Sequence, residues 1–173
     1  IYSAELLEAG AFTLTEDAVL EFGSFAKMNP PLREEADRQA VIRGLVDGTI
    51  DMIATDHAPH TAEEKAKPIT EAPSGITGLE TSLALGITEL VDRGYLTMKQ
   101  LLRLMSTNPA AMYHLDAGYL AEDGPADVIL IDTAAEFTPE KYASKATNTP
   151  FTGWNLKGEV RKTICGGRIV YEA

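Results

Sequence analysis

Three side chains able to bind a metal or move a proton, Asp56, His57 and His60, follow the short apolar run 52–54, which Thr55 closes. Such a run is typical of a strand buried on both faces, and α/β folds place their chemistry at the carboxyl ends of such strands. Carboxylate and imidazole groups suit zinc, and a metal-bound carboxylate can also take a proton from bound water. The segment therefore predicts a site, although a loop in which Asp56 only binds the following backbone amides is the alternative.

Asn29 is a further candidate, because it precedes two prolines within the segment Lys27–Arg33. Prolines restrict the backbone on both sides of the junction, and the Asn amide offers one donor group and one acceptor to a ligand with an amide or imide edge. Asn-Pro also opens ordinary loops. The residues alone support a binding site and a plain turn equally.

A glycine-containing loop, Pro73–Gly78, follows the polar segment 61–70. Its glycines allow the backbone to approach a ligand closely, although lone loop glycines more often have a structural role. The charges of segment 61–70 predict a solvated surface.

These candidates must be positioned by an α/β arrangement. The stripe of apolar residues in 33–47, ended by Gly48, predicts a helix, and the strand 51–55 follows it directly. A helix followed at once by a strand is the repeating unit of a parallel sheet or barrel. Upstream, a group of apolar residues predicts a short helix ended by Gly10. The residues are Ala4, Leu6, Leu7 and Ala11.

Two more helices and a β-rich end complete the expected elements. A helix is predicted over 79–91, a second begins at a Thr97–Gln100 capping box, and Asn108-Pro109 predicts a new helix start. After residue 117 the pattern predicts strands at 118–120, 126–132, 160–165 and 168–171. Gly166-Gly167 predicts a hairpin, and Phe151 and Trp154 are expected to hold the connection 134–157 against the body.

Composition excludes several classes of protein. A net charge of −11 over 173 residues argues against nucleic-acid binding, because that function needs basic groups that neutralise phosphates. No stretch approaches the ~20 apolar residues that span a bilayer. The single cysteine, Cys165, fits a buried inert thiol in the reducing cytosol, so we expect a cytoplasmic protein without disulfides.

Two motifs, Lys27–Arg33 and Asp51–His60, closely resemble signatures of the C-terminal portion of the dihydroorotase family in the amidohydrolase superfamily. Segments 72–81, 106–110 and 148–154 also match. The resemblance implies an α/β fold: the C-terminal part of a metal-dependent (β/α)₈ TIM barrel over 1–115, then a small β-sandwich segment over 116–173. It implies reversible, zinc-dependent ring closure of N-carbamoyl-L-aspartate to L-dihydroorotate in pyrimidine synthesis.

The resemblance also assigns roles. Asp56 is expected to bind the metal and to move the proton, and His57 to support the site by packing or hydrogen bonding. The expected substrate-binding groups are Asn29, His60 and the backbone at Ser74 and Gly75. A homodimer, or a complex with aspartate carbamoyltransferase, is the implied assembly.

The chain departs from the family pattern in its metal ligands. It has only three histidines, and it lacks the family's His-x-His motif, bridging acid or carboxylated lysine, and carboxylate-binding arginine. We therefore expect most zinc ligands upstream, in about 200 to 250 further residues of barrel. Two alternatives stay open: a non-catalytic dihydroorotase-like structural partner, and a related cyclic amidase (hydantoinase or allantoinase). Members of that latter group usually carry Ser where Asn29 stands.

Overall fold

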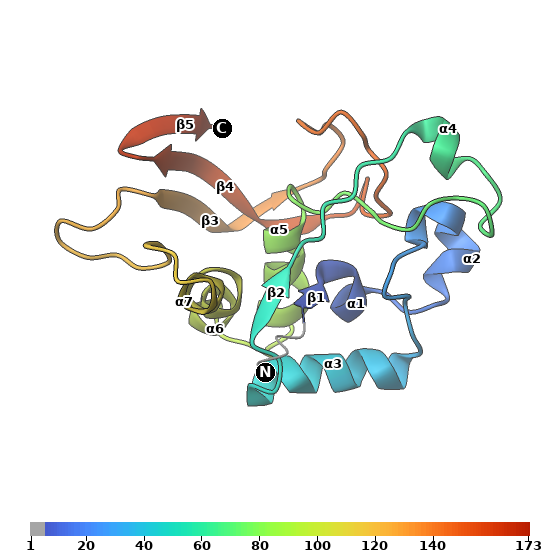
Figure 1. Cartoon of the computed structure of the whole chain (residues 1–173), viewed down its shortest axis with the longest axis horizontal. Helices are drawn as coiled ribbons and strands as arrows, with labels where there is room; N and C mark the ends of the chain where they lie inside the picture. The colour runs from blue at the N-terminus through green and yellow to red at the C-terminus, as the bar shows by residue number, and fades with distance from the viewer. Residues whose placement is uncertain (1–5) are drawn as a thin grey trace.

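A computed structural model describes residues 6–173. The chain forms a two-stranded sheet and a three-stranded sheet. In Figure 1 the short strands of the first sheet lie at the centre, with a long helix along one side and the second sheet on the other. In chain order the elements are β1 (Leu6–Glu8), α1 (Ala9–Thr13), α2 (Ala18–Phe22), η1 (Gly23–Ala26), α3 (Glu35–Asp47), β2 (Met52–Ala54), α4 (Ala62–Lys65), α5 (Ser82–Gly86), η2 (Ile87–Val91), α6 (Met98–Leu102), η3 (Arg103–Thr107), α7 (Asn108–Met112), β3 (Val128–Phe137), β4 (Leu156–Cys165) and β5 (Arg168–Glu172).

The α/β unit is formed by β1, α3 and β2. The two strands pair in parallel over their three residues, from Leu6 opposite Met52 to Glu8 opposite Ala54. The helix α3 ends at Gly48, whose φ of 83° is the left-handed conformation that glycine adopts at little cost. Its buried residues Ile42 and Leu45 join the main apolar core. The predicted helix over 33–47 and the predicted strand over 51–55 are therefore confirmed, and each predicted end lies within two residues of the observed one.

The prediction of a helix over residues 4–10 is wrong where the structure describes that segment, and Ala4 lies outside the described residues. Leu6–Glu8 form a strand because their backbone pairs with β2, and a tertiary pairing overrides local helix preference. Gly10 lies inside α1 and does not end it. A Cβ atom at Gly10 would lie 2.5 Å from the Met28 sulfur, so a larger residue here would require the flexible end of the Met28 side chain to move.

The segment 98–112 folds as one continuous run of helical turns, although the sequence predicted a new start at Asn108. Asn108 has helical φ and ψ of −67° and −47°, and its side-chain amide donates to the Asp51 carbonyl at 2.8 Å. The turn before Pro109 is a wide π turn, η3. Proline gives no N–H to the preceding turn, and this local widening accompanies it without ending the helix.

The capping box at the start of α6 is confirmed. The Thr97 hydroxyl accepts from the Gln100 amide at 3.3 Å, and the Gln100 side chain accepts from the Thr97 amide at 2.8 Å. In the full-length protein, Thr97→Ala should lower the free energy of unfolding by about 1 kcal/mol, because one helix donor loses its acceptor. Chemical denaturation measures this. Thr70→Ala, at an exposed position, is the control, and equal losses in the two variants would contradict the capping role.

The C-terminal residues form one antiparallel sheet in the order β3-β4-β5. The Gly166-Gly167 hairpin is confirmed, with φ of 54° and 75°. The predicted strand at 118–120 is wrong. β3 pairs with β4, with Val128 opposite Ile164, and residues 118–120 form no strand pairing within the described chain. The predicted β-sandwich is not confirmed either, since residues 116–173 contain this single sheet.

Cys165 is exposed, so its predicted burial is wrong. It is the last residue of β4 before the hairpin, where the strand has left the core.

The sheet and the α/β unit share one apolar core. Phe151 and Leu156, both fully buried, belong to the same cluster as Leu85 of α5 and Leu90 of η2. The Phe151 and Trp154 rings meet edge to face, with centroids 5.3 Å apart. These two residues therefore hold the connection between β3 and β4 against the body, as predicted. The division into 1–115 and 116–173 stays a prediction.

Candidate functional site

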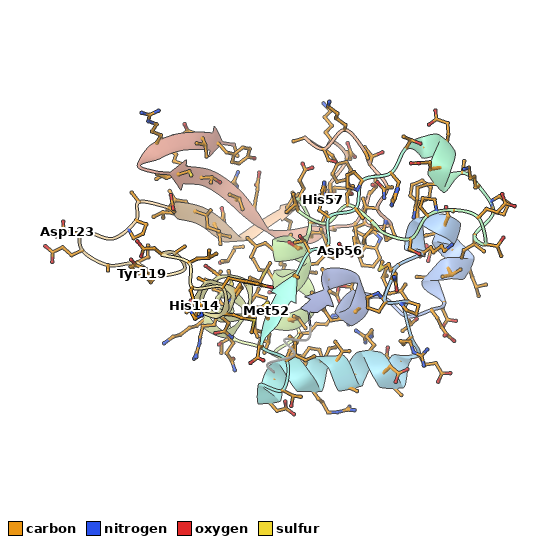
Figure 2. All side chains as sticks on the ribbon, in the orientation of Figure 1. Met52, Asp56, His57, His114, Tyr119 and Asp123 are labelled. Carbon is orange, nitrogen blue, oxygen red and sulfur yellow. The ribbon has the colours of Figure 1, made fainter. Side chains whose placement is uncertain are left out.

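Asp56 lies just beyond the carboxyl end of β2, where the sequence placed the site. Its side chain is exposed, and Figure 2 shows Asp56 and His57 together above the strand, with His114 well away beside α7. The backbone φ of Asp56 is 39°, a left-handed value that Asp and Asn tolerate better than other residues with a Cβ. The turn therefore presents the carboxylate at the strand end, outside the core.

His57 is turned toward the glycine loop that follows the polar segment. Its Nδ1 accepts a hydrogen bond from the Gly78 amide at 3.2 Å, so the neutral ring carries its proton on Nε2. A backbone bridge between His57 and Ile76 ties the same two segments. A Cβ at Gly78 would come within 2.7 Å of the Thr55 carbonyl oxygen, which explains why this position is glycine. His57 thus supports the loop, in keeping with the hydrogen-bonding role expected of it.

His60 lies between the glycine loop and α4. Its Nε2–H donates to the Ser74 carbonyl at 3.0 Å, and its Nδ1 lies 3.7 Å from the Glu64 carboxylate. A hydrogen bond from the Thr61 backbone amide lowers the pKa of Glu64, so that carboxylate is ionised at neutral pH. The His60 ring therefore lies between two oxygen groups, the Ser74 carbonyl and the Glu64 carboxylate.

Gly75 is the point at which three segments meet. Its amide donates to the Lys27 carbonyl at 2.9 Å, which joins the Asn29 motif to the glycine loop. Its carbonyl accepts from the Lys65 ammonium at 3.0 Å and from the Asn148 side-chain amide at 3.2 Å. Both backbone polar groups of Gly75 are thus engaged inside the chain. Across residues 6–173, by contrast, no hydrogen bond engages the amide or hydroxyl of Ser74.

Replacing Gly75 should strain this meeting point. An added Cβ would lie 2.5 Å from the Ala58 Cβ, and φ is +113°, where L side chains are disfavoured. In the full-length protein, Gly75→Ala should lower the free energy of unfolding by about 1–3 kcal/mol more than Gly153→Ala. Gly153 is the matched control because its φ is +83° but no atom lies within 4 Å of its added Cβ. Equal losses of unfolding free energy in the two variants would contradict the prediction, because they would mean that the contact with Ala58 does not destabilise the fold.

Asn29 is exposed, next to a cis Asn29–Pro30 peptide bond. Lys27 connects this segment to the glycine loop, because its carbonyl accepts from the Gly75 amide. Its ammonium donates to the carbonyl of Ala72, the residue before the loop, at 2.6 Å. The predicted substrate-binding residues Asn29, His60, Ser74 and Gly75 therefore belong to one connected set of loops, next to the strand end that carries Asp56.

Two residues that organise these loops escaped sequence reasoning. Lys65 is only 1% exposed, so the prediction that the charges of segment 61–70 are all solvated is wrong for this residue. The helix α4 that carries Lys65 had a visible signal, the Thr61–Glu64 capping box. Asn148 is equally buried at 2% exposure. Its segment was noted only as a supporting motif, and nothing local indicated that its side chain binds Ala58 and His60.

At this strand end the Asp56 carboxylate is an exposed group of a kind that zinc binds. Across residues 6–173, no set of three or more His, Cys, Asp or Glu side chains is arranged to hold a metal. The chain thus fits the role of a single ligand and does not by itself form a coordination shell.

Among its described helices, none has the length and apolar composition needed to cross a membrane.

Comparison with known proteins identifies the family. The amidohydrolase family profile matches residues 10–170. The dihydroorotase of Clostridioides difficile (strain 630) is 57% identical over 162 residues, which cover 94% of this chain and 38% of that protein. The dihydroorotase of Lactococcus lactis subsp. lactis (strain IL1403) is 54% identical over 163 residues, with the same coverage.

A solved structure has a similar fold. L-hydantoinase (dihydropyrimidinase) from Arthrobacter aurescens superposes with a TM-score of 0.87 at 27% identity, over 96% of this chain and 39% of that one. The chain therefore spans about two fifths of the length of the relatives it matches. Because the family profile covers nearly all of the described sequence, this chain belongs to the amidohydrolase family.

Proposed function

We propose that this chain is the C-terminal part of a zinc-dependent dihydroorotase, which interconverts N-carbamoyl-L-aspartate and L-dihydroorotate. The observation that carries the proposal is the 57% identity to a dihydroorotase over 94% of this chain. On this account β1 and β2 are neighbouring strands of a (β/α)₈ barrel whose other strands lie outside the chain. The sheet β3-β4-β5 would be one layer of a β-sandwich.

Asp56 is the group we assign to catalysis. Dihydroorotate hydrolysis forms a bond between a water oxygen and the ring amide carbon, and it breaks the bond from that carbon to the ring nitrogen. A proton must leave the water and reach the departing nitrogen, and an exposed carboxylate at the strand end can carry it. A bound zinc would lower the pKa of the attacking water to about 7. Asp56 would supply one of its ligands, and residues outside this chain the rest.

Substrate binding falls to the connected loops. Asn29 is exposed, with an amide that can pair with the ring amide or imide edge. The Ser74 amide and hydroxyl make no hydrogen bond within residues 6–173 and are therefore free to bind a ligand. His60, whose ring donates to the Ser74 carbonyl, is the next proposed substrate contact. The amide and carbonyl of Gly75 are already hydrogen-bonded within the chain. Gly75 would therefore act indirectly, by giving the loop the backbone conformation and close packing that place Ser74. The cytoplasm is the proposed location, and a homodimer or a complex with aspartate carbamoyltransferase the proposed assembly.

A hydantoinase is the second candidate, favoured by the superposition on L-hydantoinase at a TM-score of 0.87. The test is a substrate panel on the full-length protein, with dihydroorotate, hydantoin and allantoin compared by kcat/KM. We expect dihydroorotate to be preferred by at least about 100-fold, a difference of about 2.7 kcal/mol in transition-state binding. Preference for hydantoin or allantoin would reject the proposal in favour of the related amidases. Turnover of none of the three would favour the non-catalytic structural partner.

A further inference from the structure

Lys65 is a buried cation beneath the glycine loop. Its side chain comes from α4, is 1% exposed, and donates to the Pro73 carbonyl at 3.1 Å and the Gly75 carbonyl at 3.0 Å. Burial lowers the pKa of this ammonium, and the nearby Lys27 adds to the effect. Removing an ammonium from water is costly unless hydrogen bonds replace the lost hydration. At the loop that carries Ser74, the two carbonyl groups that accept from Lys65 offset part of this desolvation cost.

Asn148 grips the same loop from the opposite segment of the chain. Its side-chain amide donates to the carbonyls of Gly75, at 3.2 Å, and Ala58, at 3.0 Å. Its side-chain oxygen accepts from the His60 backbone amide at 3.0 Å. One buried side chain thus fixes the loop of His60 and that of Ser74 relative to each other.

We propose that Lys65 and Asn148 are positioning residues, which together clamp the Gly75 carbonyl and so set the places of Ser74 and His60 for substrate binding. The proposal rests on the proposed function. The two donors come from distant parts of the sequence, Lys65 from α4 and Asn148 from the connection between β3 and β4. Both donate to the same acceptor atom, the Gly75 carbonyl oxygen. The Ser24 hydroxyl donates to the Lys65 backbone carbonyl, which holds the base of this side chain in place.

Other groups near the loop do not duplicate the clamp. The Lys27 ammonium donates to Ala72, and its carbonyl accepts from the Gly75 amide, so Lys27 leaves the Gly75 carbonyl untouched. The His60 ring donates to the Ser74 carbonyl and depends on the loop for its own placement. Loss of the Lys65 ammonium would therefore leave the Gly75 carbonyl with Asn148 alone, and the Pro73 carbonyl without the donor that holds it.

The test uses the full-length protein and steady-state kinetics with dihydroorotate. Lys65→Met keeps the length and apolar stem of the side chain but removes its donors. We expect KM to rise by about 10-fold or more and kcat to stay within about threefold, because a displaced loop weakens substrate binding while Asp56 keeps its place. Lys67→Met is the matched control, since Lys67 is exposed and two residues away, and its KM should not change.

Asn148→Asp provides the second arm of the test. It retains an oxygen for the His60 amide but loses the donor to Gly75, so the same rise in KM is expected. An unchanged KM in either folded variant would overturn the proposal. Failure of both variants to give folded protein would also overturn it, because the two residues would then be structural. Absence of turnover in the unaltered protein would instead reject the proposed function, so the two failures are distinguishable.

Discussion

Asp56→Asn in the full-length protein should lower kcat for dihydroorotate hydrolysis by about 10²- to 10⁴-fold, the usual contribution of a positioned acid–base group. The amide of Asn cannot take a proton from water, and it is a weaker metal ligand than a carboxylate. Asn is the right replacement because it tolerates the φ of 39° found at this position, whereas Ala would strain the turn. The fold should persist, since the side chain is exposed.

The matched control for this variant is Asp51→Asn. Asp51 is an exposed carboxylate at the opposite end of β2. Among residues 6–173 its side chain makes no hydrogen bond, and its backbone carbonyl accepts from the Asn108 side-chain amide. Activity should be unchanged in the control. Retention of more than about half of kcat in Asp56→Asn would remove Asp56 from proton transfer. Circular dichroism of both variants separates an effect on chemistry from an effect on folding.

Phe151→Ala should cause the largest loss of stability, about 3–5 kcal/mol in the free energy of unfolding. The ring is fully buried, its edge-to-face contact with Trp154 would be lost, and the cavity would open beside Leu156 and α5. Chemical denaturation of the full-length protein measures the loss. Because Phe151 is three residues from Asn148, the variant should also loosen the clamp on Gly75 and raise KM.

Leu120→Ala is the control for this loss. Leu120 is 79% exposed, so its truncation should change the unfolding free energy by no more than about 0.5 kcal/mol. A loss below about 1 kcal/mol for Phe151→Ala would contradict the view that the sheet and the α/β unit share one core. In that case the ring would be dispensable for holding the β3–β4 connection.

The features that sequence reasoning predicted correctly are those that local pattern determines. The helix α3 and the strand β2 follow from an apolar stripe, a glycine stop and an apolar run, and the hairpin follows from Gly166-Gly167. The position of Asp56 just after β2 follows from the same pattern. In each case the responsible residues are adjacent in sequence, so local rules were sufficient.

The features that sequence reasoning missed depend on contacts between distant segments. Residues 118–120 are close to β3 in sequence, but β3 pairs instead with β4, which begins at Leu156. Lys65 looks like one of several surface charges until the loop 73–75 folds over it. Asn148 gives no local sign that its amide reaches Ala58 and Gly75. These pairings are set by the tertiary fold, which one sequence without structure does not determine.

The most direct test of the central claim is to purify dihydroorotase activity from the source cells and to analyse the active protein by intact mass and tryptic peptides. The account predicts that the active protein yields the peptide 44–65, which carries Asp56 and His60. It also predicts a mass well above 18.7 kDa, because the matched relatives are roughly two and a half times longer than this chain. An active protein that lacks this peptide, or full activity in a species of 18.7 kDa, would contradict the account.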